Sequence, residues 1–96
     1  MTYRLFITDA ARADVREIRQ RYEDQQSGLG KQFGEAVLRT IRLIHERPLM
    51  YPVYSFDVRK ALIRGFPYNV RYSMLCDVVS ILAVFSSHRH DPQWRP

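Results

Sequence analysis

The residues best suited to chemistry are a group of cations and one histidine. Arg59, Lys60, Arg64 and Arg71 lie close together in the sequence, and His88 follows a long apolar run. A guanidinium can stabilise the charge on a phosphorane, and an imidazole can act as acid or base near neutral pH. Cleavage of RNA through its 2′-hydroxyl requires such groups. Arg71, Arg64 and His88 are therefore a candidate catalytic set; simple ion pairing or solvation is the alternative role for the arginines.

The polar tail raises the question of a metal site. His88 and His90 are two residues apart, so on an extended strand they share a face and could bind a metal together with Asp91. Two imidazoles without further spaced ligands fall short of a zinc-binding pattern, and such tails are usually solvated. We therefore predict no metal site and no cofactor.

The charge of the chain indicates what kind of partner it has. The net charge of +5 comes from 15 basic and 10 acidic residues, and all but two of the basic residues are arginine. Arginine presents a planar fork that suits phosphate and carboxylate, so the partner would be nucleic acid or an acidic protein segment. A high-GC genome that favours arginine codons is the alternative explanation.

Length and composition predict one folded domain over residues 1–96. Of the 96 residues, 46% are hydrophobic, which suits a single core. No stretch reaches the roughly 20 apolar residues needed to cross a bilayer. The single cysteine, Cys76, fits a reducing compartment. We therefore expect a cytoplasmic protein.

The stretch from Phe66 to Phe85 must position the candidate residues, because it reads as a two-stranded β unit. The alternation of its first half predicts a strand with one buried face. That face consists of Tyr68, Val70, Tyr72 and Met74. Arg71 would lie on the other face, away from the helices, where an arginine is exposed by default. A turn at Cys76-Asp77 leads into the apolar run 78–85, as expected of a central strand covered on both sides.

Two helices are predicted between a first strand, Tyr3 to Thr8, and Pro48. Thr8 or Asp9 would cap the first helix, and the second would run from about Leu29 to Arg47 after a polar connection. Apolar residues at helical spacing should face the core: Ala11, Val15, Ile18 and Tyr22 in the first helix, and Leu29, Phe33, Ala36, Val37, Ile41 and Ile44 in the second. His45 should be exposed or bound to the carbonyls at the helix end.

Two further segments are open to two interpretations each. Arg12, Arg16 and Arg19 form a second stripe on the first helix, which is either a solvated face or a partner surface. The aromatic segment from Leu49 to Phe56 is either a loop that covers a core edge or a groove for a partner.

The order of elements is then strand, helical hairpin and three-stranded meander. The first two strands of the meander lie within Asp57 to Ile63 and Phe66 to Leu75, and the last strand follows the turn after them. This predicts an α+β fold with a small antiparallel-rich sheet that carries two helices on one face. The last strand, being the most apolar, should lie in the middle beside the first.

This order, together with a set of residues, resembles the RelE/ParE superfamily of toxins from bacterial type II toxin-antitoxin systems. The residues are Ala11-x-x-Asp14, Tyr22, Phe33, Pro48, Val58-Arg59, Phe66-Pro67-Tyr68, Val70-x-Tyr72 and Val79-x-Ile81-x-x-Val84. The resemblance runs from Tyr3 to Trp94. The Phe66-Pro67-Tyr68 step and the ending from His88 to Trp94 are most similar to the ParE branch, which includes plasmid stabilisation proteins.

The resemblance implies a small cytoplasmic toxin that inhibits growth and is neutralised by an antitoxin. ParE proteins generally act on DNA gyrase by protein-protein contact, whereas the RelE branch cleaves messenger RNA on the ribosome. His88 falls where the mRNA-cleaving relatives have a histidine or an aromatic residue at the end of the last strand. Arg89 stands where tyrosine is frequent, and the lysine-rich strand of the most ribosome-dependent members is absent. The resemblance therefore favours a ParE-like toxin over a ribosome-dependent endoribonuclease.

We expect the antitoxin to bind through an acidic amphipathic helix with an extended part. The residues expected to face the antitoxin or the target are Arg12, Arg16, Arg19, Tyr51, Tyr54, Arg59, Arg89, His90 and Trp94. A non-toxic relative that serves only as a binding module or co-repressor is a third hypothesis.

Overall fold

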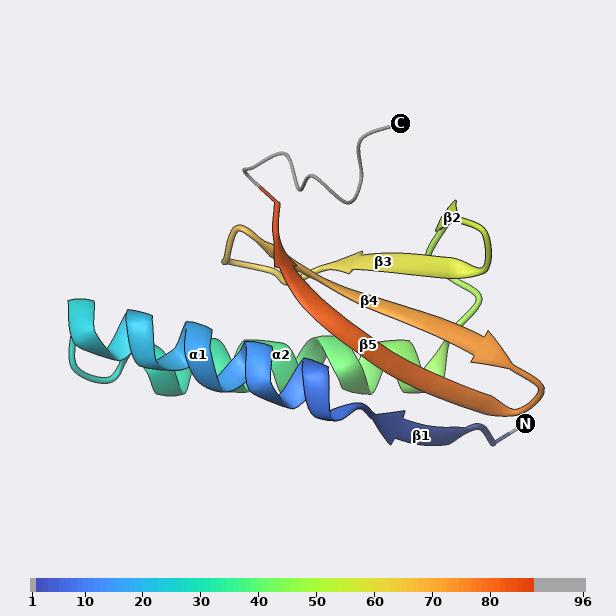
Figure 1. Ribbon diagram of the computed structural model, residues 1–96, viewed down its shortest axis with the longest axis horizontal. Coiled ribbons are helices and arrows are strands. Elements are labelled where there is room, and N and C mark those ends of the chain that lie inside the picture. The colour runs from blue at the N-terminus through green and yellow to red at the C-terminus, as the bar shows by residue number, and fades with distance from the viewer. Residues whose placement is uncertain (1, 88–96) are drawn as a thin grey trace.

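The computed structural model describes residues 2–87 as two helices and one five-stranded sheet (Figure 1). The elements are β1 (Arg4–Ile7), α1 (Asp9–Gln25), α2 (Leu29–Glu46), β2 (Val53–Ser55), β3 (Val58–Leu62), β4 (Tyr68–Leu75) and β5 (Val78–Ser86). Within this part of the chain, neither helix is long and apolar enough to cross a membrane.

The longest strand, β5, is an interior strand of the sheet. The strand order is β1-β5-β4-β3-β2, with β1 parallel to β5 and the other neighbours antiparallel. Strand β5 thus lies between β1 and β4, as predicted from its apolar sequence. Both helices pack on the same side of the sheet (Figure 1). The predicted α+β fold is confirmed.

Two expectations about the strands need correction. Val53–Ser55, predicted within an irregular segment, pairs with β3 as the edge strand β2, so the meander has four strands. Strand β5 is not covered on both faces by helices. Val79, Ile81 and Val84 are buried, whereas the side chains between them are partly exposed, because α1 and α2 both lie on one side.

The start of α1 is bonded directly to β5. Thr8 caps the helix, since its Oγ1 accepts from the Ala11 amide at 3.1 Å and donates to the Ile81 carbonyl at 2.9 Å. One turn later, Asp14 Oδ2 accepts a hydrogen bond of 3.0 Å from the Val84 amide. These bonds fix how α1 lies against the sheet, and the bond to Asp14 pairs the Val84 amide of β5 past the end of β1.

The connection between the helices depends on glycine and on one carboxylate. Gly28 has a φ of +91° and no side chain with which to cap α2. Glu23 at the end of α1 supplies the acceptor instead, at 3.0 Å from the Gly28 amide and 3.1 Å from the Gly30 amide. A methyl group at Gly30 would lie 2.7 Å from the Arg19 carbonyl oxygen, so the helices touch here.

The core fills the space between the helix hairpin and the sheet. Apart from Leu29, which is half-buried at the start of α2, the predicted inward residues of both helices are buried or packed against the buried core, as are Val70 and Tyr72 of β4. Four aromatic rings join α1, α2 and β4, with paired centroids from 5.2 to 6.1 Å apart. These rings belong to Tyr22, Phe33, Phe66 and Tyr68. Tyr22 and Phe33 are thus core residues, as predicted.

His45 is neither exposed nor bound to the end of its own helix. Its ring is half-buried, and Nε2 donates to the Tyr3 carbonyl oxygen at 2.5 Å. The histidine therefore ties the end of α2 to the residue before β1, a contact between segments that the sequence alone does not place together.

Candidate functional site

A groove of about 410 Å³ opens between α1 and α2. Its floor is apolar and draws on both helices, on the end of β1 and on β5. The apolar lining residues are Ile7, Ala11, Val15, Val37, Leu38, Ile41, Ile81 and Val84. Leu38 is 56% exposed, so a large apolar side chain faces solvent at the mouth of the groove.

The rim of the groove is strongly basic. The predicted stripe of Arg12, Arg16 and Arg19 forms the α1 side, and Lys31 and Glu35 lie on the α2 side. Four cations thus face one carboxylate. None of these five side chains forms a hydrogen bond or an ion pair with another of residues 2–87. Their charges are solvated and can pair with a partner, with no internal ion pair to break.

Arg19 lies across α2 at a position without a side chain. A methyl group at Gly34 would be 3.2 Å from Cζ and Nε of Arg19 and 3.3 Å from its Cδ. The glycine thus lets the arginine side chain lie flat on the neighbouring helix. The Arg19 guanidinium thus lies at the end of the groove near the helix connection.

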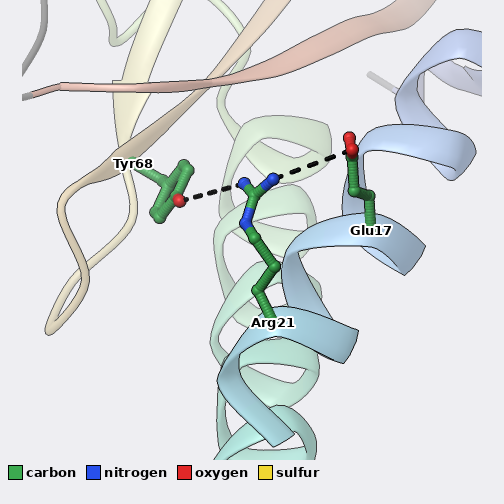
Figure 2. Close-up of polar contacts among 3 residues, drawn as sticks. All are labelled: Glu17, Arg21 and Tyr68. Atoms are coloured by element: carbon green, nitrogen blue, oxygen red, sulfur yellow. Dashed lines mark hydrogen bonds and ion pairs between the residues drawn. The ribbon is translucent and has the colours of Figure 1, made fainter. Parts of the chain in front are cut away.

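The fourth arginine of α1, Arg21, faces elsewhere. Figure 2 shows Arg21 between Glu17 and Tyr68: Nη2 donates to the Tyr68 hydroxyl at 3.4 Å, and Nη1 lies 3.7 Å from Glu17 Oε2. Arg21 does not line the groove. The hydrogen bond to Tyr68 raises the pKa of the Arg21 guanidinium above its ordinary value. The ion pair of Arg21 with Glu17 is exposed, and the hydrogen bond of Arg21 to Tyr68 links α1 to β4. Neither contact belongs to the groove.

Arg71 is buried, contrary to the expectation for an arginine on a helix-free face. It is 6% exposed, because its Cζ lies 3.7 Å from the centre of the Phe85 ring and 5.1 Å from that of Tyr54. Lys60 Nζ also lies 5.1 Å from the Tyr54 ring. Strands β2, β3, β4 and β5 thus bring together two cations and two aromatic rings.

The other candidate catalytic residues do not join Arg71 within the described part of the chain. Lys60 is the strand partner of Arg71, and Arg64 lies in an exposed turn beyond the end of β3 at Leu62. His88, Arg89, His90 and Trp94 lie outside the residues that the structure describes, as does the possible metal pair of His88 and His90.

Arg59 and Tyr51 hold the segment after α2 on the sheet. Arg59 Nη1 donates to the carbonyl oxygen of Tyr51 and, at 3.4 Å, to that of Leu49. The Tyr51 ring packs edge-on against Tyr72 at 6.2 Å. Tyr72 donates to the Pro48 carbonyl at 2.6 Å, and burial raises its pKa to about 12. Here the segment covers a core edge, the first of the two interpretations.

The expected partner surface therefore divides into separate regions. Arg12, Arg16 and Arg19 line the groove, whereas Tyr54 lies in the cluster around Arg71. Sequence reasoning missed Lys31, Glu35 and Leu38 as companions of the arginines. Leu38 was the available signal, because it directly follows Val37 and widens the apolar stripe of α2 beyond what the core needs.

Comparison with known proteins assigns a family. The model of the ParE toxin of the type II toxin-antitoxin system, parDE, matches residues 5–91. The chain belongs to the ParE toxin family. The protein is thus a toxin of a type II toxin-antitoxin system, and its family implies an antitoxin as partner. A search of curated proteins finds no match.

Solved structures show the same fold for this ParE-family chain. A chain of the chromosomal ParDE toxin-antitoxin system from P. aeruginosa aligns with a TM-score of 0.68 and 16% identity, covering 88% of this chain and 96% of that one. The isolated E. coli RelE toxin aligns with a TM-score of 0.67 and 19% identity, covering 93% and 88%. A double arginine-to-alanine mutant of E. coli RelE in the free state aligns with a TM-score of 0.64 and 18% identity, covering 92% of this chain and 86% of that one.

Proposed function

We propose that this ParE-family toxin inhibits growth by contact with a protein target and is neutralised by an antitoxin segment that fills the groove between α1 and α2. The observation that carries the antitoxin site is an apolar floor beneath four cations and one carboxylate that lack partners among residues 2–87. An amphipathic helix with an acidic flank meets both demands, since its apolar face covers the floor and its carboxylates reach the arginines.

The chemistry of the groove favours a protein segment over nucleic acid. Eight of its lining residues are apolar, and apolar area gains about 25 cal/mol per Å² when it leaves water. A phosphate backbone would use the cations and leave this floor uncovered. The stripe of Arg12, Arg16 and Arg19 repeats at spacings of four and three, which matches carboxylates one turn apart on a helix laid alongside α1.

DNA gyrase is the proposed target, on the strength of the resemblance to ParE proteins. The packing of Arg71 supports contact over catalysis. Its guanidinium packs against two rings and the residue is 6% exposed, whereas a cation that must stabilise a phosphorane needs access to the substrate.

The experiment that tests this function induces the chain in a bacterial host, alone and with the product of the adjacent reading frame. We expect growth to stop when the chain is induced alone and to recover when the product of the adjacent reading frame is induced with it. The two proteins should also co-purify. The purified chain should inhibit supercoiling by gyrase. Growth without arrest, but with co-purification, would instead favour a binding module or co-repressor. Arrest without any affinity for the neighbour would contradict the antitoxin site.

A second candidate function is a ribosome-dependent endoribonuclease. The observation that favours it is the cluster of Lys60 and Arg71 with Tyr54 and Phe85, because cations next to aromatic rings suit a nucleic-acid strand. Arg71, Arg64 and His88 would then be catalytic. The nuclease hypothesis predicts new 5′ ends in cellular mRNA, which vanish in His88→Ala and weaken in Lys60→Gln. Intact messages during growth arrest would exclude it.

A further inference from the structure

The groove between α1 and α2 has two unlike ends. Because the helices are antiparallel, Arg19 and Lys31 lie at the end next to the helix connection, while Ile7 and Ile41 lie at the other end. Arg16 and Glu35 lie between these ends and balance each other in charge. The end next to the connection thus carries two cations, whereas the end beside β1 carries only Arg12 among apolar residues.

Arg19 gives the cationic end its shape. Its side chain rests on Gly34, and no hydrogen bond or ion pair with another of residues 2–87 holds its guanidinium. Lys31 is one turn before Gly34 on the same helix and is likewise unpaired within that part of the chain. Two free cations therefore face any segment that reaches this end, and both offer donors to carbonyl or carboxylate oxygens.

We infer that the antitoxin helix lies in the groove parallel to α1, with its C-terminal turn at Arg19 and Lys31. This inference rests on the proposed antitoxin site and adds its direction. The last four carbonyls of a helix lack internal partners, and the helix dipole places partial negative charge there. In the opposite direction, the helix would present unpaired amides and partial positive charge to two cations.

The groove also sets which residues the helix must carry. Carboxylates should lie on the flank that faces Arg12 and Arg16, and apolar residues should face Leu38 and Ile41. The residue opposite Glu35 should be basic or neutral, because a second carboxylate there would be repelled. Glu35 is therefore a specificity determinant: Glu35→Gln should relax discrimination against antitoxins with an acid at that position.

Binding measurements test the cationic end. The probe is the purified product of the adjacent reading frame, titrated against the full-length toxin. Arg19→Gln should weaken binding about tenfold, as expected for the loss of a charge-assisted hydrogen bond. Arg39→Gln removes an exposed arginine of the same helix pair that does not line the groove, and should leave affinity within about twofold. Equal effects of the two variants would contradict the inference.

Label distances test the direction. Single cysteines are placed by Ala10→Cys or Ser27→Cys in a Cys76→Ser background, all at exposed positions. Ala10 lies in the first turn of α1 and Ser27 lies just beyond its end at Gln25, so at 1.5 Å per residue the two sites are separated by roughly 22 Å of helix. With a second label directly after the antitoxin helix, the distance to residue 27 should be the shorter one by a comparable amount.

The outcomes separate the direction from the proposed function. A shorter distance to residue 10, with binding intact, would overturn the direction and leave the antitoxin site standing. No binding of the antitoxin would overturn both. A dimer of the toxin alone that Leu38→Asp disrupts would show that a second copy of this chain fills the groove, and would contradict the inference as well.

Discussion

At the scale of single residues, surroundings decide what a charged or polar side chain can do. Alternation along β4 correctly places Arg71 on the face away from the core, but it does not predict that Arg71 is buried there. That burial depends on rings from Tyr54 and Phe85, which are distant in the sequence and meet Arg71 only through strand pairing. Sequence patterns give the face of a side chain and leave out its tertiary neighbours.

Tyr72 gives a prediction at this scale. Its hydroxyl is fully buried and donates to Pro48, so Tyr72→Phe should cost about 1 kcal/mol of unfolding free energy near pH 8. Urea unfolding monitored by circular dichroism measures this cost. Tyr51→Phe is the control, since the hydroxyl of that half-buried ring forms no hydrogen bond with another of residues 2–87.

The same residue predicts a pH dependence. The folded-state pKa of Tyr72 is raised to about 12 by burial, so above pH 10 the unfolded chain loses the proton first. Stability from this group is fully present below pH 10 and is lost as the pH rises towards 12. At pH 11 the loss is on the order of 1 kcal/mol. Tyr72→Phe should lack this loss, so a difference from wild type that is unchanged between pH 8 and pH 11 would contradict the account.

At the scale of elements, the helix hairpin is held by close backbone approach at Gly30. Gly30→Ala places a methyl group 2.7 Å from the Arg19 carbonyl, which must shift, at a cost of about 1 to 3 kcal/mol. Gly34→Ala, one turn on, meets only the flexible Arg19 side chain and gains helix propensity. In thermal unfolding, the melting temperature of Gly30→Ala should be well below that of Gly34→Ala. The reverse order would refute the close contact.

The bond between Asp14 and Val84 predicts how α1 is fastened to β5. Asp14→Ala leaves the Val84 amide without its acceptor and should cost about 1 to 3 kcal/mol. Asp24→Ala removes an exposed carboxylate near the end of the same helix and should cost less than half as much. Amide exchange of Val84 is the most direct reporter, since it should accelerate only in the first variant.

Local periodicity explains which elements the sequence predicts. Both helices and β4, the turn at Cys76-Asp77 and β5 follow from apolar spacing and lie close to their predicted bounds. Strand β2 has three residues, too few for an alternation to stand out, and depends on pairing with β3. The groove could not be predicted as a unit, because it arises from how two helices pack. Only its arginine stripe is visible in the sequence.

At the scale of the whole molecule, the helices divide the surface into two regions of different character. On the helix side, the groove combines an apolar floor with a rim of charged side chains that are unpaired within residues 2–87. On the opposite face of the sheet, the cations pack against aromatic rings. The proposed antitoxin site lies on the first of these. The net charge of +5 then has a proposed role in binding the antitoxin, because four of the cations line one groove.

The measurement that tests the groove most directly is the affinity of the adjacent reading frame's product for Leu38→Asp and for Leu43→Asp. Both leucines are exposed on α2, at 56% and 48%, but only Leu38 lines the groove. The matched changes should reduce helix stability alike. We expect Leu38→Asp to weaken binding by tenfold or more, about 1.4 kcal/mol, and Leu43→Asp to change it little. Equal affinities for the two variants would contradict the groove as the antitoxin site.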